Sequence, residues 1–141
     1  AKDYVKMMWM ILQHDNAEDW IIATGKSFSI REFVIMSFNY VGIKLKFVGT
    51  GINEKAFIES CSGKYDIQIG KEVLSVDKKY FRPTEVEYLL GDPTKAKEKL
   101  GWVPKISIKG LVADMMKSDL KLMKKQKFLN NNGYDTPNFF E

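Results

Sequence analysis

The chain has 141 residues, of which 45% are hydrophobic, so it is long enough to bury one core and fits a single domain. Its net charge of +4 comes from 22 basic and 18 acidic residues, a balance that does not by itself indicate a nucleic-acid-binding surface. Cys61 is the only cysteine and His14 the only histidine, which excludes an internal disulfide bond and metal sites built from Cys and His clusters. No apolar run approaches the roughly 20 residues of a membrane span, so we expect a soluble, cytoplasmic protein without a membrane partner.

The first segment predicts an amphipathic helix and then a strand. Apolar residues recur at helical spacing from Tyr4 to Leu12, and this helix is apolar nearly all round, so it should be covered on several sides. No N-cap residue precedes it, and we therefore expect the chain to be a fragment of something larger. Residues 20–25 form a short apolar run that ends at a glycine, which predicts a buried strand.

The next segment predicts a capped helix and a second strand. Ser29 and Glu32 have the spacing of a capping box, in which both side chains satisfy backbone amides of the first turn. The helix should extend to about Val41, with Gly42 as its stop, and residues 43–48 alternate apolar and basic as a half-exposed strand. Strand, helix and strand with short connections form a βαβ unit, whose two strands are expected to be parallel.

The middle of the chain carries weaker signals. Residues 49–71 show little periodicity and many polar groups, so we interpret them as a long excursion with weak structure. A strand should follow from Lys71 to Val76.

Two further helices are expected towards the end of the chain. Asp92 as N-cap, Pro93 as first helical residue and Gly101 as stop frame a short helix, on which Trp102 should pack back. A final helix should run over residues 108–125, capped by Ser107, with lysines at its end that complement the helix dipole. Together these elements predict an α/β domain over residues 1–129, with a small parallel sheet, three to five helices and a flexible tail at residues 130–141.

Arg82 and Glu85 are the candidate binding residues. Pro83 stiffens the backbone beside Arg82, so the guanidinium is presented from a rigid loop, where its planar fork of donors suits a diphosphate. Glu85, three residues later, is an acceptor suited to the two hydroxyls of a ribose. The alternative is that the two side chains form an exposed ion pair worth about 0–1 kcal/mol.

One pair with catalytic spacing is rejected. Tyr40 and Lys44 are spaced as Tyr-x-x-x-Lys, but Gly42 lies between them and Lys44 should already be in a strand, so they cannot share one helix face.

Several other residues are interpreted as structural. Residues 49–51, Gly-Thr-Gly, lack the third glycine and the following helix of a phosphate-binding loop and are expected to form a turn. Lys55 and Lys71 are at most weak electrostatic contributors to phosphate binding. Neither His14 nor Cys61 is expected to act chemically.

The motif Arg-Pro-Thr-Glu-Val at residues 82–86 resembles that of the GDP-mannose 4,6-dehydratases, members of the extended short-chain dehydrogenase/reductase superfamily. The stretches that agree in the same order are residues 1–5, 22–25, 30–34, 42–47 and 49–51, and the resemblance extends to about residue 135. It implies that the chain is the helix-rich carboxyl-terminal, substrate-binding part of such an enzyme, in which Arg82 contacts the diphosphate and Glu85 also contacts the substrate.

The resemblance also implies what the whole enzyme does. NADP and the catalytic Thr, Glu and Tyr-x-x-x-Lys residues belong to an amino-terminal Rossmann half that is absent here, so no catalytic residue is expected in this chain and the fragment should be inactive alone. The whole enzyme would be a lyase, a homo-oligomer when full length, that converts GDP-mannose to GDP-4-keto-6-deoxymannose for GDP-fucose biosynthesis.

Two other interpretations remain open. The lysine-rich last helix could make the chain a basic module that binds nucleic acid or an anionic membrane, although few aromatic residues accompany those lysines. The chain could also be the substrate domain of another nucleotide-sugar epimerase or dehydratase; Glu85 favours the mannose enzyme.

Overall fold

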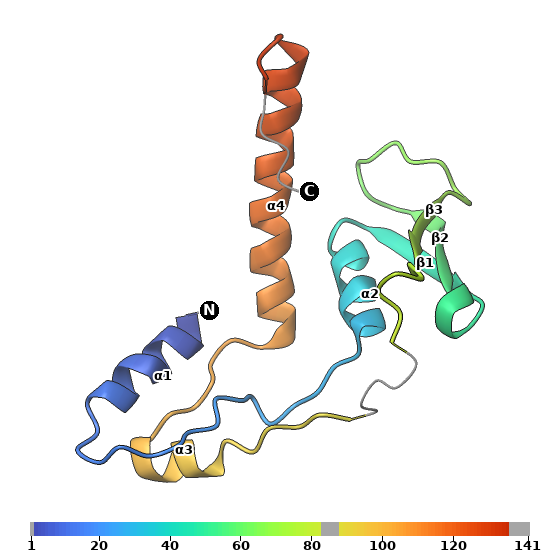
Figure 1. Cartoon of the computed structure of the whole chain (residues 1–141). Coiled ribbons are helices and arrows are strands. Elements are labelled where there is room, and N and C mark those ends of the chain that lie inside the picture. The colour runs from blue at the N-terminus through green and yellow to red at the C-terminus, as the bar shows by residue number, and fades with distance from the viewer. Residues whose placement is uncertain (1, 83–87, 136–141) are drawn as a thin grey trace.

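The computed structural model describes residues 2–82 and 88–135, which hold four α-helices and one three-stranded sheet (Figure 1). In chain order the elements are α1 (Lys2–Leu12), α2 (Ile30–Tyr40), β1 (Ile43–Val48), the 3₁₀ turn η1 (Gly51–Asn53), β2 (Lys55–Cys61), β3 (Glu72–Ser75), α3 (Thr94–Leu100) and α4 (Ile108–Asn131).

These elements form two packed ends joined by extended segments (Figure 1). At one end α1 packs near α3, around a cluster of Met7, Ala96 and Trp102. At the other end α2 lies against β1 of the sheet and also contacts α4, which rises beside it. None of the helices in the described ranges is long and apolar enough to cross a membrane.

The local signals for helix ends are confirmed. Ser29 Oγ accepts a hydrogen bond from Glu32 N at 3.1 Å, and a Glu32 carboxylate oxygen accepts one from Ser29 N at 2.7 Å, which completes the capping box of α2. Ser107 Oγ accepts from Gly110 N at 3.2 Å and caps α4. Gly101 ends α3 with a left-handed φ of 65°.

Other boundaries differ slightly from expectation. The short helix α3 begins at Thr94 with Pro93 as its N-cap, so the prediction of Asp92 as N-cap and Pro93 as first helical residue is one residue out; Asp92 Oδ1 accepts a hydrogen bond from Thr94 N at 2.9 Å. The last helix continues to Asn131, past the expected end at Lys125 and into the segment expected to be a tail. Of that tail, residues 136–141 lie outside the described ranges.

The parallel βαβ prediction is wrong. The strand order is β1-β2-β3 and both pairings are antiparallel. Residues 20–25 form no strand, since no described segment offers them a ladder of backbone hydrogen bonds, so α2 joins no parallel pair. The chain instead reverses directly after β1, where Gly49 at a φ of 83° opens the turn into η1.

The interpretation of residues 49–71 as weakly structured is also wrong. They contain β2, the central strand of the sheet, in which Ala56 and Ile58 are 0% and 2% exposed. In the sequence, Ala56, Phe57 and Ile58 are only three consecutive apolar residues with polar residues on both sides, a run too short to predict a strand. The pairing with β3, which was expected at residues 71–76 and is found at Glu72–Ser75, therefore determines the strand.

Trp102 packs back on α3, as predicted. It is 3% exposed, its backbone N–H donates to Ala96 O at 3.2 Å, and its indole Nε1–H donates to Asp3 O at 3.0 Å. The second bond crosses from the segment after α3 to α1, so this one side chain joins the two helices.

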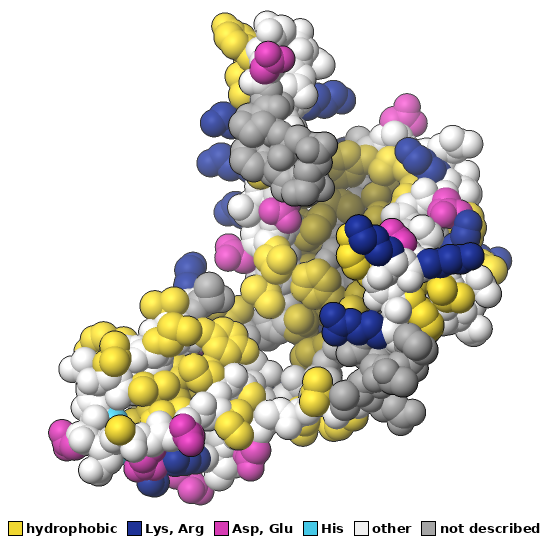
Figure 2. Space-filling view, in the orientation of Figure 1, with side chains coloured by type: hydrophobic (Ala, Val, Ile, Leu, Met, Phe, Trp, Pro, Cys, Tyr) yellow, Lys and Arg dark blue, Asp and Glu magenta, His cyan; other side chains and the backbone are white. Residues whose placement is uncertain are grey.

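The chain leaves much of its surface uncovered. Its accessible surface is 11473 Å², about 4,000 Å² more than the roughly 7,500 Å² of a compact monomer of 16.3 kDa. Hydrophobic side chains spread over the α1 end of the molecule in Figure 2. On α1 the exposed ones are Tyr4, Val5, Met8, Trp9 and Leu12.

Candidate functional site

Arg82 lies at the surface, on the segment that follows β3. A short turn precedes it, in which Asp77 O accepts hydrogen bonds from Tyr80 N and Phe81 N, both at 3.1 Å. The guanidinium is therefore presented to solvent directly after a hydrogen-bonded turn. Glu85 falls in the stretch outside the described ranges, so its position relative to Arg82 stays a prediction.

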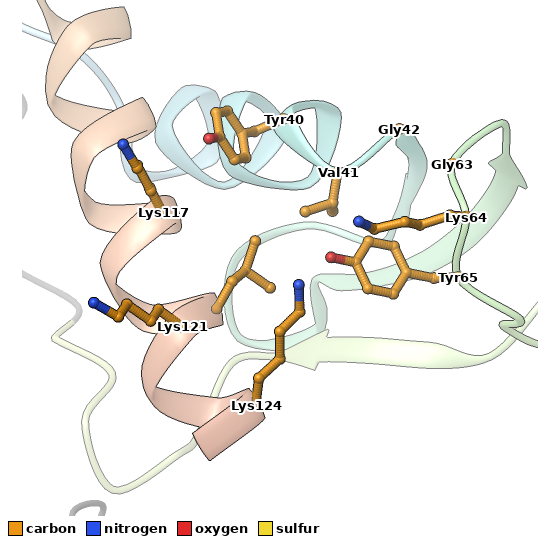
Figure 3. Close-up of a pocket in the computed structure, with 10 residues that line it drawn as sticks. Tyr40, Val41, Gly42, Gly63, Lys64, Tyr65, Lys117, Lys121 and Lys124 are labelled. Carbon is orange, nitrogen blue, oxygen red and sulfur yellow. The ribbon is translucent and has the colours of Figure 1, made fainter. Parts of the chain in front are cut away.

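A cavity of about 680 Å³ lies at the carboxyl end of α2 and is closed on one side by α4 (Figure 3). Three parts of the chain line it: the end of α2, the turn after β2, and one face of α4. Its lining residues are Tyr40, Val41, Gly42, Gly63, Lys64, Tyr65, Lys117, Leu120, Lys121 and Lys124.

The turn after β2 is fixed against the end of α2. Ser62 N and Ser62 Oγ both donate to Gly42 O, at 2.8 and 3.2 Å, and Cys61 Sγ donates to Tyr65 O at 3.5 Å. A Cβ on Gly63 would lie 2.2 Å from Val41 O, so only glycine allows this approach of the two backbones. The wall that carries Lys64 and Tyr65 is thus held in place.

The cavity is strongly positive. Lys117, Lys121 and Lys124 occupy the i, i+4 and i+7 positions of α4, and Lys64 faces Lys124 from the turn, whereas the Lys117 and Lys121 ammonium groups extend away from it (Figure 3). No Asp or Glu is found among the described residues that line it. Figure 3 shows the Lys64 and Lys124 ammonium groups and the Tyr65 hydroxyl directed into the same space.

A second hollow, of about 900 Å³, separates α1 from the start of α4. Apolar side chains such as Phe28, Trp102 and Leu111 contribute to it, and the backbone amides of Lys105 and Ile106 on its wall donate to Asp3 Oδ2 at 2.9 and 2.8 Å. Arg82 lines neither hollow.

Among the carboxylates of residues 2–82 and 88–135, the one with the largest pKa shift is Glu18, at the α1–α3 end. Hydrogen bonds from the Lys95 and Lys99 side chains lower the pKa of Glu18 from 4.5 to about 2. Both ammonium groups lie 2.8 Å from its carboxylate, and Lys95 also sits 4.7 Å from the centre of the Trp20 ring. This cluster fixes the segment after α1 to α3, which is a structural role.

The Tyr40 and Gly-Thr-Gly predictions are confirmed, whereas Lys55 lies in a strand and not in a loop. Tyr40 ends α2 while Lys44 lies in β1, so the two do not share a helix. The 49–51 glycines lead only into the short turn η1. Lys55 pairs with Glu72 across β2 and β3 at 2.8 Å.

His14 and Cys61, which were not expected to act chemically, both have structural contacts. Cys61 Sγ donates to Tyr65 O at 3.5 Å. His14 stacks edge-on to Trp20, with ring centres 5.3 Å apart. In the described ranges no three His, Cys, Asp or Glu side chains gather as a metal site.

Sequence reasoning missed the lysine cavity. It treated the lysines at the end of the last helix as complements of that helix's own dipole, and it placed Lys64 in a weakly structured excursion. The helical spacing of Lys117, Lys121 and Lys124 was visible, but the partner face becomes apparent only once the turn after β2 is fixed beside α2.

Comparison with known proteins places the chain in one family. The family model described as GDP-mannose 4,6 dehydratase matches residues 1–115. The chain is 51% identical over 137 residues to a GDP-mannose 4,6-dehydratase of Yersinia enterocolitica, an alignment that covers 96% of this chain and 37% of the relative. It is 45% identical over 124 residues to a GDP-mannose 4,6 dehydratase of Homo sapiens, covering 88% of this chain and 31% of the relative. The chain thus spans roughly a third of the length of these curated relatives.

Proposed function

Since this chain belongs to the GDP-mannose 4,6-dehydratase family, we propose that it is the substrate-binding part of an enzyme that converts GDP-mannose to GDP-4-keto-6-deoxymannose, a lyase reaction that leads towards GDP-fucose. The observation that carries this proposal is the family match over residues 1–115, which includes the Arg82 motif. A cytoplasmic, homo-oligomeric enzyme is part of the same proposal.

Arg82 and Glu85 are proposed to hold the substrate. The exposed guanidinium of Arg82 follows a hydrogen-bonded turn and can donate paired bonds to a diphosphate, and Glu85 can accept from ribose hydroxyls. Their contribution is binding and orientation, which holds the hexose where reaction occurs. Catalytic residues are proposed to lie outside this chain.

NADP, which would supply hydride transfer, has no fitting site among the described residues. A dinucleotide needs a glycine-rich turn that opens a helix, so that free amides at the helix N-terminus receive its pyrophosphate. The first turns of α2 and α4 are occupied by Ser29 and Ser107, and the 49–51 glycines open only η1. We therefore assign NADP to the part of the family's fold that this chain does not span.

The uncovered surface supports the proposal that another part of the enzyme packs against this chain. An excess of about 4,000 Å² on one chain exceeds the roughly 800 Å² that each partner buries in a standard protein–protein interface, and also the roughly 1,000–2,500 Å² per partner of most obligate ones. Trp9, 61% exposed, and Leu12, 80% exposed, lie on the face of α1 that points away from the Met7 cluster. Such apolar side chains are the ones that anchor permanent interfaces.

The test is reconstitution. The chain is co-expressed with the portion of the Yersinia enterocolitica relative that it does not cover, and the purified complex is assayed for conversion of GDP-mannose with NADP added. We expect activity only in the complex. A stable complex that leaves GDP-mannose unchanged, or that acts instead on another nucleotide sugar, contradicts the assigned substrate.

In that complex, Arg82→Ala should raise KM for GDP-mannose by roughly 10- to 100-fold, the loss of about 1.5–3 kcal/mol from charge-assisted bonds. Affinity for NADP should not change. Lys79→Ala, which removes an exposed cation three residues away, is the control and should leave KM within twofold. An unchanged KM in Arg82→Ala would refute the role of Arg82.

A further inference from the structure

The positive cavity between α2, the turn after β2 and α4 is left unassigned by the proposed function. Three of its four lysines lie on α4 and the fourth on the turn after β2, and the ion pairs found in the described ranges use other cations, namely Arg31, Lys55, Lys95 and Lys99. Like charges gathered around one hollow repel one another, at a cost that falls when an anion enters.

The end of α2 does not balance this charge. The carboxyl end of a helix carries about half a negative charge, and α2 has no basic residue in its own last turn, so one lysine nearby is expected there. Lys64 and Lys124 direct two formal charges into the cavity, which leaves an excess of more than one, while Lys117 and Lys121 extend away from that space (Figure 3) and add charge only to its rim. The helix dipole therefore explains part of the cluster and not its size.

We propose that this cavity binds a small molecule through a phosphate or diphosphate group. Lys64 and Lys124 point into it from opposite walls and Tyr65 adds a hydroxyl donor, so several donors converge on one point (Figure 3). A phosphate has more acceptor oxygens than a carboxylate, and lysine ammonium groups hold phosphates as point charges.

The size and lining of the cavity suit a small ligand. Its volume of about 680 Å³ lies within the range of small-molecule sites, roughly 300–1,000 Å³. Tyr40 contributes an aromatic ring that is 46% exposed, and Val41 and Leu120 contribute apolar surface beside the charged groups. A nucleotide or another phosphorylated metabolite would use both kinds of surface.

This site is distinct from the Arg82 segment. The turn that carries Lys64 follows Cys61, at one end of β2, whereas β3 ends at Ser75, which pairs with Lys55 at the other end. A strand of this length spans about 20 Å. The chain therefore leaves the sheet towards Arg82 at the end far from the cavity, and the phosphate site adds to the substrate site instead of extending it.

The experiment titrates the full chain with inorganic diphosphate and follows backbone amide resonances by NMR, with calorimetry for affinity. We expect the Gly42 and Gly63 resonances to shift on binding. The double variant Lys64→Gln/Lys124→Gln should bind diphosphate at least tenfold more weakly, while Arg82→Gln should leave these shifts in place. Titration with GDP and with inorganic phosphate shows whether a nucleoside or a second phosphate strengthens binding.

The charge-matched control is Lys46→Gln/Lys125→Gln, which removes two exposed lysines outside the lining of the cavity. It should weaken binding less than threefold. Equal loss in both double variants would show that diphosphate responds only to net charge and would overturn the proposal. Chemical-shift changes confined to other residues, with the Gly42 and Gly63 resonances unchanged, would also overturn the proposal. Circular dichroism of each variant confirms that the helices are retained, so that weaker binding reports the site.

Discussion

Trp102→Ala should be among the most destabilising single substitutions in the α1–α3 end. The side chain is 3% exposed against Met7 and Ala96, which are 0% and 1% exposed, so truncation removes apolar contact and leaves a cavity. Burial of a tryptophan side chain of about 200 Å² is worth at most about 5 kcal/mol, and measured Trp→Ala losses in cores are about 3–5 kcal/mol. We expect a loss of about 3–4 kcal/mol.

A second variant separates the hydrogen bond from the packing. Trp102→Phe keeps most of the apolar volume but removes the indole N–H that donates to Asp3 O at 3.0 Å. Since Asp3 lies within α1 and its carbonyl can keep the intrahelical bond, only the net value of one hydrogen bond is lost, about 0.5–1.5 kcal/mol. Because that bond joins α1 to the segment after α3, its loss should loosen α1 before it affects the sheet.

Urea unfolding of the full chain, followed by circular dichroism at 222 nm, measures both variants. Trp9→Ala is the control, since Trp9 is 61% exposed, and it should change the free energy of unfolding by less than about 0.5 kcal/mol. Equal losses in Trp102→Ala and Trp102→Phe would refute the division into packing and hydrogen bonding. A loss below about 1 kcal/mol in Trp102→Ala would refute the buried cluster itself.

Three further predictions concern stability. Gly63→Ala should cost about 1–3 kcal/mol in urea unfolding, because its Cβ would lie 2.2 Å from Val41 O, whereas Gly110→Ala, whose Cβ meets only contacts of 3.5 Å or more, should gain up to about 1 kcal/mol. Ser29→Ala removes the capping-box acceptor of α2 and should cost about 1 kcal/mol; thermal unfolding that is unchanged would contradict it. The pKa of Glu18 is lowered to about 2 from 4.5 in the folded chain, so its contribution to stability is complete above about pH 4.5 and is lost as the pH falls towards 2. Urea unfolding between pH 5 and pH 2 should show a smaller decrease in Glu18→Gln than in the unaltered chain.

Features that depend on neighbouring residues could be predicted from the sequence. The Ser29 capping box, the Gly101 stop and the Ser107 cap each act within one helical turn, so spacing alone identifies them. The return of Trp102 onto α3 was predictable for the same reason, because the stop at Gly101 turns the chain back.

Features that depend on residues far apart in the chain could not be predicted from the sequence. Residues 20–25 have a strand-like composition, but a strand exists only where a second segment supplies hydrogen bonds, and the described chain supplies none. Conversely, β2 has only three consecutive apolar residues and becomes the central strand because β1 and β3 flank it. The lysine cavity required the same long-range information, since Lys64 and Lys124 meet only through the docking of the 61–65 turn beside α2.

The uncovered residues connect the stability of this chain to its proposed function. Tyr88 and Leu89, 66% and 73% exposed, lie just beyond the Arg82 motif, so exposed apolar surface is found beside the proposed binding loop as well as on α1. Burying that surface against another part of the enzyme would stabilise the fold and also fix the segment that carries Arg82. The same contacts would stabilise the fold and fix the Arg82 segment. A partner that covers residues 88–90 should therefore raise both the thermal stability of the chain and, in the proposed enzyme, the affinity for GDP-mannose.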